Sequence, residues 1–193
     1  MKLAILGPPG SGKTTQSELI SKRLGILHIY PGQLLRREAE TDSPLVSKIR
    51  QHLDAGTMVP AKIVMHLVER EMSKAPNGFA LDGYPRDMEQ ACALEALLRE
   101  LNEKMDAVID LHLDEPEIYR RLLERGRPDD KPEIIAGRIE LYHDDTDPVL
   151  QYYGEMGILI SVSGQGPAEE VTDRILSAHG TRSAVSGNTT IRS

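Results

Sequence analysis

The chain has 193 residues, of which 39% are hydrophobic and 27% charged, with a formal net charge of −7 and a single cysteine. This length suits one well-cored domain with small inserted parts, and no apolar run approaches the roughly 20 residues of a membrane span. The acidic balance disfavours a nucleic-acid partner, one cysteine excludes an internal disulfide or a multi-cysteine zinc site, and the lack of a leader pattern before the first strand predicts a cytoplasmic location.

The first predicted strand, at residues 2–6, leads into the sequence GPPGSGKTT at residues 7–15. This sequence matches the phosphate-loop pattern G-x-x-x-x-G-K-[ST], and a helical pattern follows it to about residue 24, as the motif requires. Its glycines allow backbone N–H groups to form an anion nest at the helix N-terminus. Lys13 then supplies a cation to the β- and γ-phosphates, while Thr14 or Thr15 offers a hydroxyl to Mg²⁺ or to a phosphate oxygen. An ordinary glycine-rich turn, the alternative interpretation, has no use for the lysine.

A helical stretch then interrupts the alternation of strands and helices. A short strand is predicted at residues 27–29, after which helical patterns cover 34–38, 44–54 and 60–72. No convincing strand occurs among these roughly forty residues. We interpret residues 30–72 as a small inserted lobe.

Residues 78–83 resume the sheet with a short buried strand that ends in Asp82. Functional groups gather at the carboxyl ends of parallel strands, so Asp82 should lie near the phosphate loop and is a candidate for holding Mg²⁺ or its waters. Alternatively, it tightens the turn that begins at Gly83. A helix at 87–102 follows, and we interpret its Cys92 as a small buried residue rather than a reactive thiol.

The second half of the chain continues the alternation. Strands are predicted at residues 107–113 and 157–162, and helices at 114–124, 133 to about 143, and 167–178. Asp147-Pro148 starts a further segment that reaches Tyr153. His112 is interpreted as a strand-surface residue, and Asp114 as a helix N-cap. Residues 181–193, rich in Ser, Thr and Gly, are expected to form a disordered tail. The whole pattern predicts an α/β fold with a parallel five-stranded sheet flanked by helices.

Six arginines occur in or beside segments predicted to approach the carboxyl ends of the strands: Arg36, Arg86, Arg121, Arg125, Arg127 and Arg138. A planar guanidinium binds phosphate oxygens through two bonds and keeps its charge, so we interpret the set as a cationic gate for phosphates. Taken singly, each could instead be a solvated surface residue. Within the same gate, Asp129 and Asp130 are predicted to pair with Arg125 and Arg127 when the loop is open.

The sequence offers no plausible Ser-His-Asp or Cys-His arrangement. Transfer of a γ-phosphoryl group to another phosphate needs no general base, because the acceptor is already an oxyanion. Catalysis then consists of positioning the reactants and neutralising the charge on the equatorial oxygens. Lys13, Mg²⁺ and the arginines are suited to that task.

From about residue 2 to 178, the chain resembles the adenylate kinase family of nucleoside monophosphate kinases. The resemblance is carried by residues 7–16, His28-Ile29 with Gly32 and Leu35-Arg36, Ala55-Gly56 with Val59, residues 78–86 with Gln90, residues 121–127 with Asp129-Asp130, Arg138, and Gly164 with Pro167.

The resemblance implies reversible transfer of the γ-phosphoryl group of ATP to AMP, giving two ADP, with Mg²⁺ as cofactor. Catalytic roles are implied for Lys13, Arg86, Arg125, Arg127 and Arg138. The residues implied to bind ATP are Gly10, Ser11, Gly12, Lys13, Thr14, Thr15, Arg121, Arg125 and Gly166. Those implied to bind AMP are Pro31, Arg36, Thr57, Val59, Gly83, Arg86, Gln90, Arg127 and Arg138. Thr14 would bind the metal directly, and Asp82 through water.

The resemblance also implies a monomer with one nucleoside monophosphate kinase domain at 1–180, in which the inserted helical lobe at 30–72 binds the monophosphate. The core would consist of residues 1–29, 73–124 and 133–180, and residues 125–132 would form a short lid. Closure of lobe and lid would exclude water.

Four positions depart from the family pattern. Thr14 stands where glycine is usual, Pro31 replaces a threonine that contacts adenine, Gln33 replaces an aspartate near the magnesium waters, and Thr57 stands where a basic residue is common. The nearest alternative is therefore the same chemistry on CMP, UMP or another monophosphate. An alternative of a different class is a nucleotide-binding regulatory module with weak catalysis.

Overall fold

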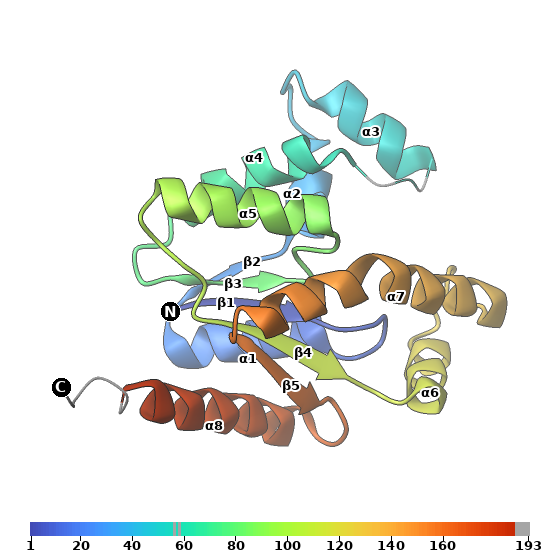
Figure 1. Ribbon diagram of the computed structural model, residues 1–193. Coiled ribbons are helices and arrows are strands. Elements are labelled where there is room, and N and C mark those ends of the chain that lie inside the picture. The colour runs from blue at the N-terminus through green and yellow to red at the C-terminus, as the bar shows by residue number, and fades with distance from the viewer. Residues whose placement is uncertain (56, 58, 188–193) are drawn as a thin grey trace.

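The computed structural model describes residues 1–55, 57 and 59–187. Strands and helices alternate along the chain, apart from one purely helical stretch (Figure 1). The elements are β1 Lys2–Leu6, α1 Lys13–Leu24, β2 Leu27–Ile29, α2 Pro31–Glu38, α3 Val46–Ala55, α4 Ala61–Met72, β3 Phe79–Asp82, α5 Met88–Glu100, β4 Ala107–His112, α6 Glu115–Arg125, α7 Pro132–Glu155, β5 Leu159–Ser163 and α8 Ala168–Gly187.

The five strands form one parallel sheet in the order β2-β3-β1-β4-β5, which confirms the predicted fold class. The central strand β1 leads directly into the phosphate loop. Its register aligns Ile5 with Asp82 of β3, so Asp82 lies beside the start of that loop. The carboxyl ends of the strands are where a parallel sheet presents functional groups.

The sheet separates two apolar clusters. Side chains of successive strand residues point to opposite faces, so Ala4 and Leu6 belong to one cluster whereas Leu3 and Ile5 belong to the other. In Figure 1, α5 and α7 lie on one side of the sheet and α1 and α8 on the other. Burial of both faces explains why the strands have nearly continuous apolar sequences.

The helical stretch between β2 and β3 contains α2, α3 and α4, with no strand among its described residues. It packs on the sheet through buried residues of α2 and α4, including Leu34, Leu35, Leu67 and Val68. Helix α3 ends at Ala55, and Gly56, which the sequence pattern marks as its end, lies outside the described residues.

The long helix α7 corrects one expectation. The sequence predicts a helix ending near 143 and a separate segment from Asp147-Pro148, but α7 runs without interruption from Pro132 to Glu155. Proline removes one helical hydrogen bond, here to the carbonyl of Asp144. Asp144 and Pro148 are both exposed, so water can satisfy that carbonyl, while Val149 and Tyr153 anchor the helix in the core.

Helix α8 extends to Gly187, whereas the sequence pattern predicts a helix end at 178 and disorder from 181. After Pro167 no proline interrupts this segment, and a lone Gly180 lowers helix propensity by only about 1 kcal/mol relative to alanine. Residues 188–193 lie outside the described part of the chain.

Cys92 is exposed, so the interpretation as a buried residue is wrong. The buried side of α5 is formed by Gln90, Ala91, Leu94 and Leu98, and Cys92 falls on the other side of the helix.

His112 is exposed at the end of β4, as predicted, and Asp114 is the N-cap of α6. Among the described helices, none combines the length and the apolar character needed to cross a bilayer.

Candidate active site

The phosphate loop joins β1 to α1. Gly12 is the N-cap of α1 and has a φ of 93°, a left-handed conformation that favours glycine. The N–H of Ser11 donates to the carbonyl of Pro8 at 3.1 Å, which closes the loop on itself. The first N–H groups of α1 consequently form the positive end of the helix at the cleft.

Lys13 is held beside this loop. Its ammonium donates a hydrogen bond to the carbonyl of Pro8 at 3.2 Å. Burial, and then the nearby charge of Arg86, lower the pKa of Lys13 to about 8, while Asp82 opposes the shift. The side chain is therefore a cation at neutral pH, with little surrounding water to weaken its attraction for a phosphate.

Asp82 ends β3 with 1% of its surface exposed. One carboxylate oxygen, Oδ2, lies 3.4 Å from Nε2 of His28. The other, Oδ1, is buried and has no hydrogen-bond partner among the described residues. A buried carboxylate oxygen without a partner fits a role in holding the water of a bound cation.

Within the described part of the chain, no group of three or more His, Cys, Asp or Glu side chains could hold a metal ion. This donor set does not suit a metal held entirely by protein ligands. It does suit Mg²⁺, which keeps several waters and binds through one or two protein oxygens together with substrate phosphates. Thr14, Thr15 and Asp82 all line the cleft and offer oxygens for that role.

A cleft of about 670 Å³ opens over the carboxyl ends of β1 and β3. All six arginines singled out in the sequence line it, together with Lys13, although they come from α2, the segment after β3, α6, the loop after α6, and α7. The other lining residues are Pro9, Gly10, Gly12, Thr14, Thr15, Tyr30, Asp82 and Leu122. Charge of one sign in a concave site attracts a polyanion such as a nucleotide phosphate chain.

Arg86 is fixed by several contacts around its backbone. Its N–H donates to Oε1 of Gln90 at 2.9 Å, and its carbonyl accepts a hydrogen bond from the hydroxyl of Thr146 at 2.9 Å. Its Nε donates to the carbonyl of Gly83 at 3.1 Å. A second cavity of about 200 Å³, lined by Lys13, Gly83, Arg86, Arg138 and Thr146 among others, adjoins this position.

Gln90 does not line the cleft. It is only 3% exposed, and while its oxygen accepts from Arg86, its Nε2 donates to Asp87 at 2.9 Å. In this structure the side chain therefore holds the arginine rather than facing a base.

The residues after α6 form an ion-pair network around Asp130. Its carboxylate accepts hydrogen bonds from Nε and Nη2 of Arg125 at 2.9 and 2.6 Å, and Nη1 of Arg138 lies 3.4 Å away. These arginines, Arg125 above all, lower the pKa of Asp130 to about 2. Arg127 joins through its backbone N–H at 3.0 Å, and Arg138 also bonds the exposed Asp129 at 3.0 Å. The predicted pairing thus holds for Arg125 and Asp130, whereas Arg138 takes the place expected for the Arg127 guanidinium.

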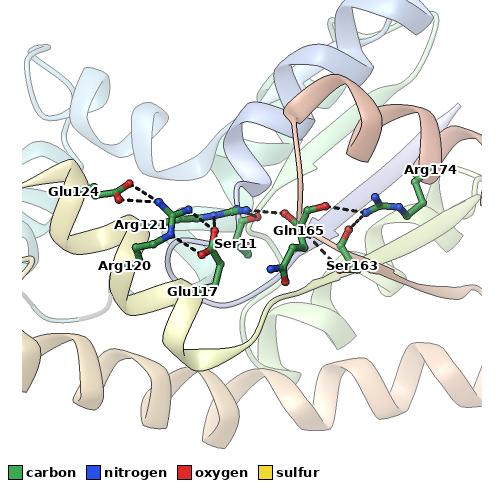
Figure 2. A network of polar contacts seen from close by, with 9 residues as sticks. Ser11, Glu117, Arg120, Arg121, Glu124, Ser163, Gln165 and Arg174 are labelled. Atoms are coloured by element: carbon green, nitrogen blue, oxygen red, sulfur yellow. Dashed lines mark hydrogen bonds and ion pairs between the residues drawn. The ribbon is translucent and has the colours of Figure 1, made fainter.

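Arg121 connects α6 to two loops (Figure 2). Its Nε donates to Glu117 at 2.7 Å, Nη2 donates to the carbonyl of Gly164 at 3.0 Å, and Nη1 approaches the carbonyl of Ser11 at 3.5 Å. Hydrogen bonds from Arg120 and then Arg121 lower the pKa of Glu117 to about 2. The guanidinium is therefore fixed between the phosphate loop and the loop that follows β5.

The β5–α8 loop also contacts the phosphate loop directly. A Cβ added at Gly164 would lie 2.9 Å from the carbonyl oxygen of Ser11, so only glycine fits without displacing one of the two loops. Gly166, the residue predicted for ATP binding, does not line the cleft, whereas Gly164 contacts Arg121.

Several other predicted residues lie away from the cleft. Pro31 and Val59 are buried, and the exposed Thr57 has its hydroxyl 2.9 Å from Nδ1 of His52. The hydroxyl of Ser11 is buried without a partner among the described residues.

Sequence reasoning missed Tyr30, which lines the cleft next to Pro31. No pattern in the sequence marks a lone tyrosine at a strand-to-helix junction as a site residue.

Comparisons with known proteins agree with this geometry. The family model described as "Adenylate kinase" matches residues 5–158. Proteins named adenylate kinase from Nocardia farcinica and Mycolicibacterium smegmatis are 41% and 43% identical to the chain, each over 182 residues that cover 93% of this chain and 99% of the relative. One from Synechococcus sp. is 42% identical over 175 residues, or 90% of this chain and 96% of the relative.

Proposed function

The chain belongs to the adenylate kinase family, an ATP-dependent phosphotransferase family, and we propose how its own residues transfer the γ-phosphoryl group of ATP to AMP to give two ADP. The observation that supports the proposal most strongly is that one lysine and six arginines, drawn from several elements, line a single cleft at the end of β1. Two substrates that each carry phosphates repel one another, and this cationic lining offsets that repulsion.

The donor side of the cleft is assigned to the phosphate loop. Backbone N–H groups of Gly10 to Thr15 bind the ATP phosphates at the positive end of α1, and Lys13 contacts the β- and γ-phosphates. Arg121, which the structure fixes between two loops, is assigned to the base of ATP. The glycine that contacts Arg121 is Gly164, not Gly166.

The acceptor side is assigned to Arg36 and Arg86, which bind the phosphate of AMP through bidentate hydrogen bonds. Gln90 fixes the backbone of Arg86 in this structure, so its contact with the acceptor base requires the amide to turn. Pro31, Thr57 and Val59 belong to the same helical insertion and are assigned to the surroundings of the base.

Thr14 and Asp82 are the residues proposed to hold Mg²⁺, the threonine directly and the aspartate through water. The bound ion neutralises charge on the β- and γ-phosphates. Arg125, Arg127 and Arg138 stabilise the charge that develops on the transferred group, and the acceptor phosphate attacks without a general base because it is already ionised.

The proposed domain division is a core of 1–29, 73–124 and 133–180, a monophosphate-binding lobe at 30–72 and a short lid at 125–132. Closure of lobe and lid brings their arginines to the phosphates and excludes water, which prevents hydrolysis of ATP. We also propose that the enzyme acts as a monomer and in the cytoplasm, where ATP, ADP and AMP are exchanged.

An acceptor panel tests the proposed function. Wild-type protein is assayed with ATP, Mg²⁺ and each of AMP, dAMP, CMP, UMP and GMP, and AMP is expected to give the highest kcat/KM. Lys13→Met should lower turnover by about 10²-fold or more, because it removes a charge that contacts the transferring phosphates. Lys22→Met is the matched control, since Lys22 is exposed on the same helix. Negligible AMP turnover beside a good rate with a pyrimidine monophosphate would contradict the assignment of the acceptor.

A further inference from the structure

Tyr30 lies in the cleft without an assigned role. It is the N-cap residue of α2 and lines the same cavity as the six arginines and Lys13. Its hydroxyl makes no hydrogen bond to the residues that the structure describes. A phenol surrounded by cations, with its donor free, differs from a tyrosine that merely fills the core.

The backbone of Tyr30 is set by the residue that follows it. Proline disfavours the helical conformation in the preceding residue, and Tyr30 is accordingly extended, with a φ of −114° and a ψ of 98°. This conformation separates the end of β2 from the start of α2 and directs the side chain of Tyr30 toward the cleft.

The ring of Tyr30 is held on several sides. The guanidinium carbon of Arg36 lies 5.5 Å from the ring centroid, within the range of a cation–π interaction. The imidazole of His28 is nearly parallel to the ring, at a centroid distance of 6.5 Å. A Cβ added at Gly32 would lie 3.1 Å from two ring carbons and 3.2 Å from the hydroxyl oxygen, so the absent side chain leaves room for the phenol.

The ring therefore supports Arg36. Arginine has many rotamers, and a side chain that is free in solution must be ordered when it binds a phosphate. An aromatic face beneath the guanidinium reduces the number of conformations to be lost, while leaving the N–H groups at its edge free for phosphate oxygens.

Tyr30 shares the cleft with cations from two separate elements. Arg36 of α2, which lies against its ring, and Arg125 of α6 both line the same cavity as Tyr30. A phosphate bound by these cations therefore lies within the cavity that Tyr30 also lines.

We propose that Tyr30 is a phosphate-binding residue of the acceptor site: its ring orients Arg36, and its hydroxyl donates a hydrogen bond to a phosphate oxygen of the bound monophosphate. The inference rests on the proposed function, because it assigns Tyr30 to the acceptor substrate. A phosphate monoester offers more lone pairs than one arginine can satisfy, so a neutral donor beside the guanidinium adds a bond without adding like-charge repulsion.

Two variants separate the hydroxyl from the ring. Tyr30→Phe removes only the hydroxyl, and Tyr30→Leu removes the aromatic face as well. Tyr30→Phe should raise both the KM for AMP and the calorimetric Kd for AMP, measured without ATP, by about tenfold, as expected for one hydrogen bond to a charged group. Tyr30→Leu should raise both further, while the KM for ATP stays within about twofold of wild type.

The matched control is Tyr152→Phe, because Tyr152 packs against the core from α7 and does not line the cleft. Thermal unfolding of each variant checks that the fold is retained, and AMP is replaced by the best acceptor of the panel if another monophosphate proves better. A Tyr30→Phe variant whose Kd for the monophosphate stays within twofold of wild type overturns the inference. An equal rise in the KM for ATP overturns the assignment to the acceptor. Failure of the wild type to use AMP, by contrast, would refute the proposed acceptor. The Kd of Tyr30→Phe is then compared with that of wild type for the monophosphate that the wild type does use, and the same twofold limit applies.

Discussion

Burial beside Arg86 lowers the pKa of Lys13 to about 8, and this value links nucleotide binding to pH. The ammonium form is the one that attracts phosphate, so its share falls as the pH rises through the pKa. Bound phosphates stabilise the charged form and must raise the pKa in the complex. By linkage, binding of ATP must then take up a proton at a pH near 8.

Calorimetry measures this uptake. At about pH 8, where roughly half of the free protein carries an uncharged Lys13, ATP binding should take up about half a proton, whereas near pH 6 Lys13 itself takes up almost none. The number follows from the slope of the binding enthalpy against the ionisation enthalpy of the buffer. In Lys13→Arg the guanidinium is always charged, so the slope at about pH 8 should fall to nearly zero. A wild-type slope of zero at that pH would contradict the pKa of Lys13.

Individual residues differed in how far the sequence determined their roles. The spacing of the phosphate-loop motif and the choice of arginine at positions near strand ends were enough to predict which cations line the cleft. The orientation of Gln90 and the position of Tyr30 were not predictable. Both depend on contacts with Arg86, Asp87, Arg36 or Gly32 that form only when the chain folds.

At the scale of elements, the segment joining α6 to α7 is organised around one carboxylate. Asp130 has no exposed side-chain surface and bonds two arginines, whereas Asp129 is 54% exposed and contacts only Arg138 among the described residues. Since its pKa is lowered, the contribution of Asp130 to stability is present above the ordinary carboxyl pKa and is lost as the pH falls toward 2.

Two amide variants compare these acids. Asp130→Asn should lower kcat by about tenfold or more, because Arg125 and Arg138 lose the shared anion that places them, and small displacements of catalytic groups are costly. Asp129→Asn should change kcat by no more than about twofold, as for other exposed ion pairs. Steady-state kinetics at saturating ATP and AMP gives both values. Equal effects of the two variants, or faster turnover in Asp130→Asn, would show that the network does not position the arginines.

The elements themselves followed closely from sequence patterns. Apolar runs located all five strands, and the strand-helix alternation gave the parallel sheet. The errors occurred where tertiary contacts override local propensity. Pro148 lies inside α7 because burial of Val149 and Tyr153 offsets the loss of one helical hydrogen bond. Cys92 is exposed because it lies one position after the buried Ala91, which is enough to turn its side chain away from the core side of α5.

For the whole molecule, the main feature is a cationic cleft within a chain of net charge −7. The acidic residues must lie predominantly elsewhere on the surface, so the field draws phosphates toward the cleft and away from other faces. Helices α2 to α4 extend from the β2–β3 side of the sheet, and α6 from the β4 side (Figure 1). These two parts, α2 to α4 and α6, are called the two arms here. Nucleotides that bind cations on both arms should bring them together.

Fluorescence transfer tests this closure. Leu53 on α3 and Leu123 on α6, which are 39% and 49% exposed, are replaced by cysteine and labelled in a Cys92→Ser background, because the native thiol is also exposed. Transfer efficiency should rise when ATP and AMP are added together without Mg²⁺, and less with either alone. A control pair at the exposed Lys22 of α1 and Arg99 of α5 should not respond. An unchanged efficiency in the first pair would exclude movement of the arms toward each other.

Gly164 has a consequence for how this sequence can evolve. Because its missing side chain lets the β5–α8 loop press against the carbonyl of Ser11, a change at this position would displace the phosphate loop, 153 residues earlier in the chain. Selection should therefore retain glycine here even though position 164 contributes no side chain to substrate. Neighbouring positions can vary more freely, but a change in the backbone of one of these loops requires a matching change in the other.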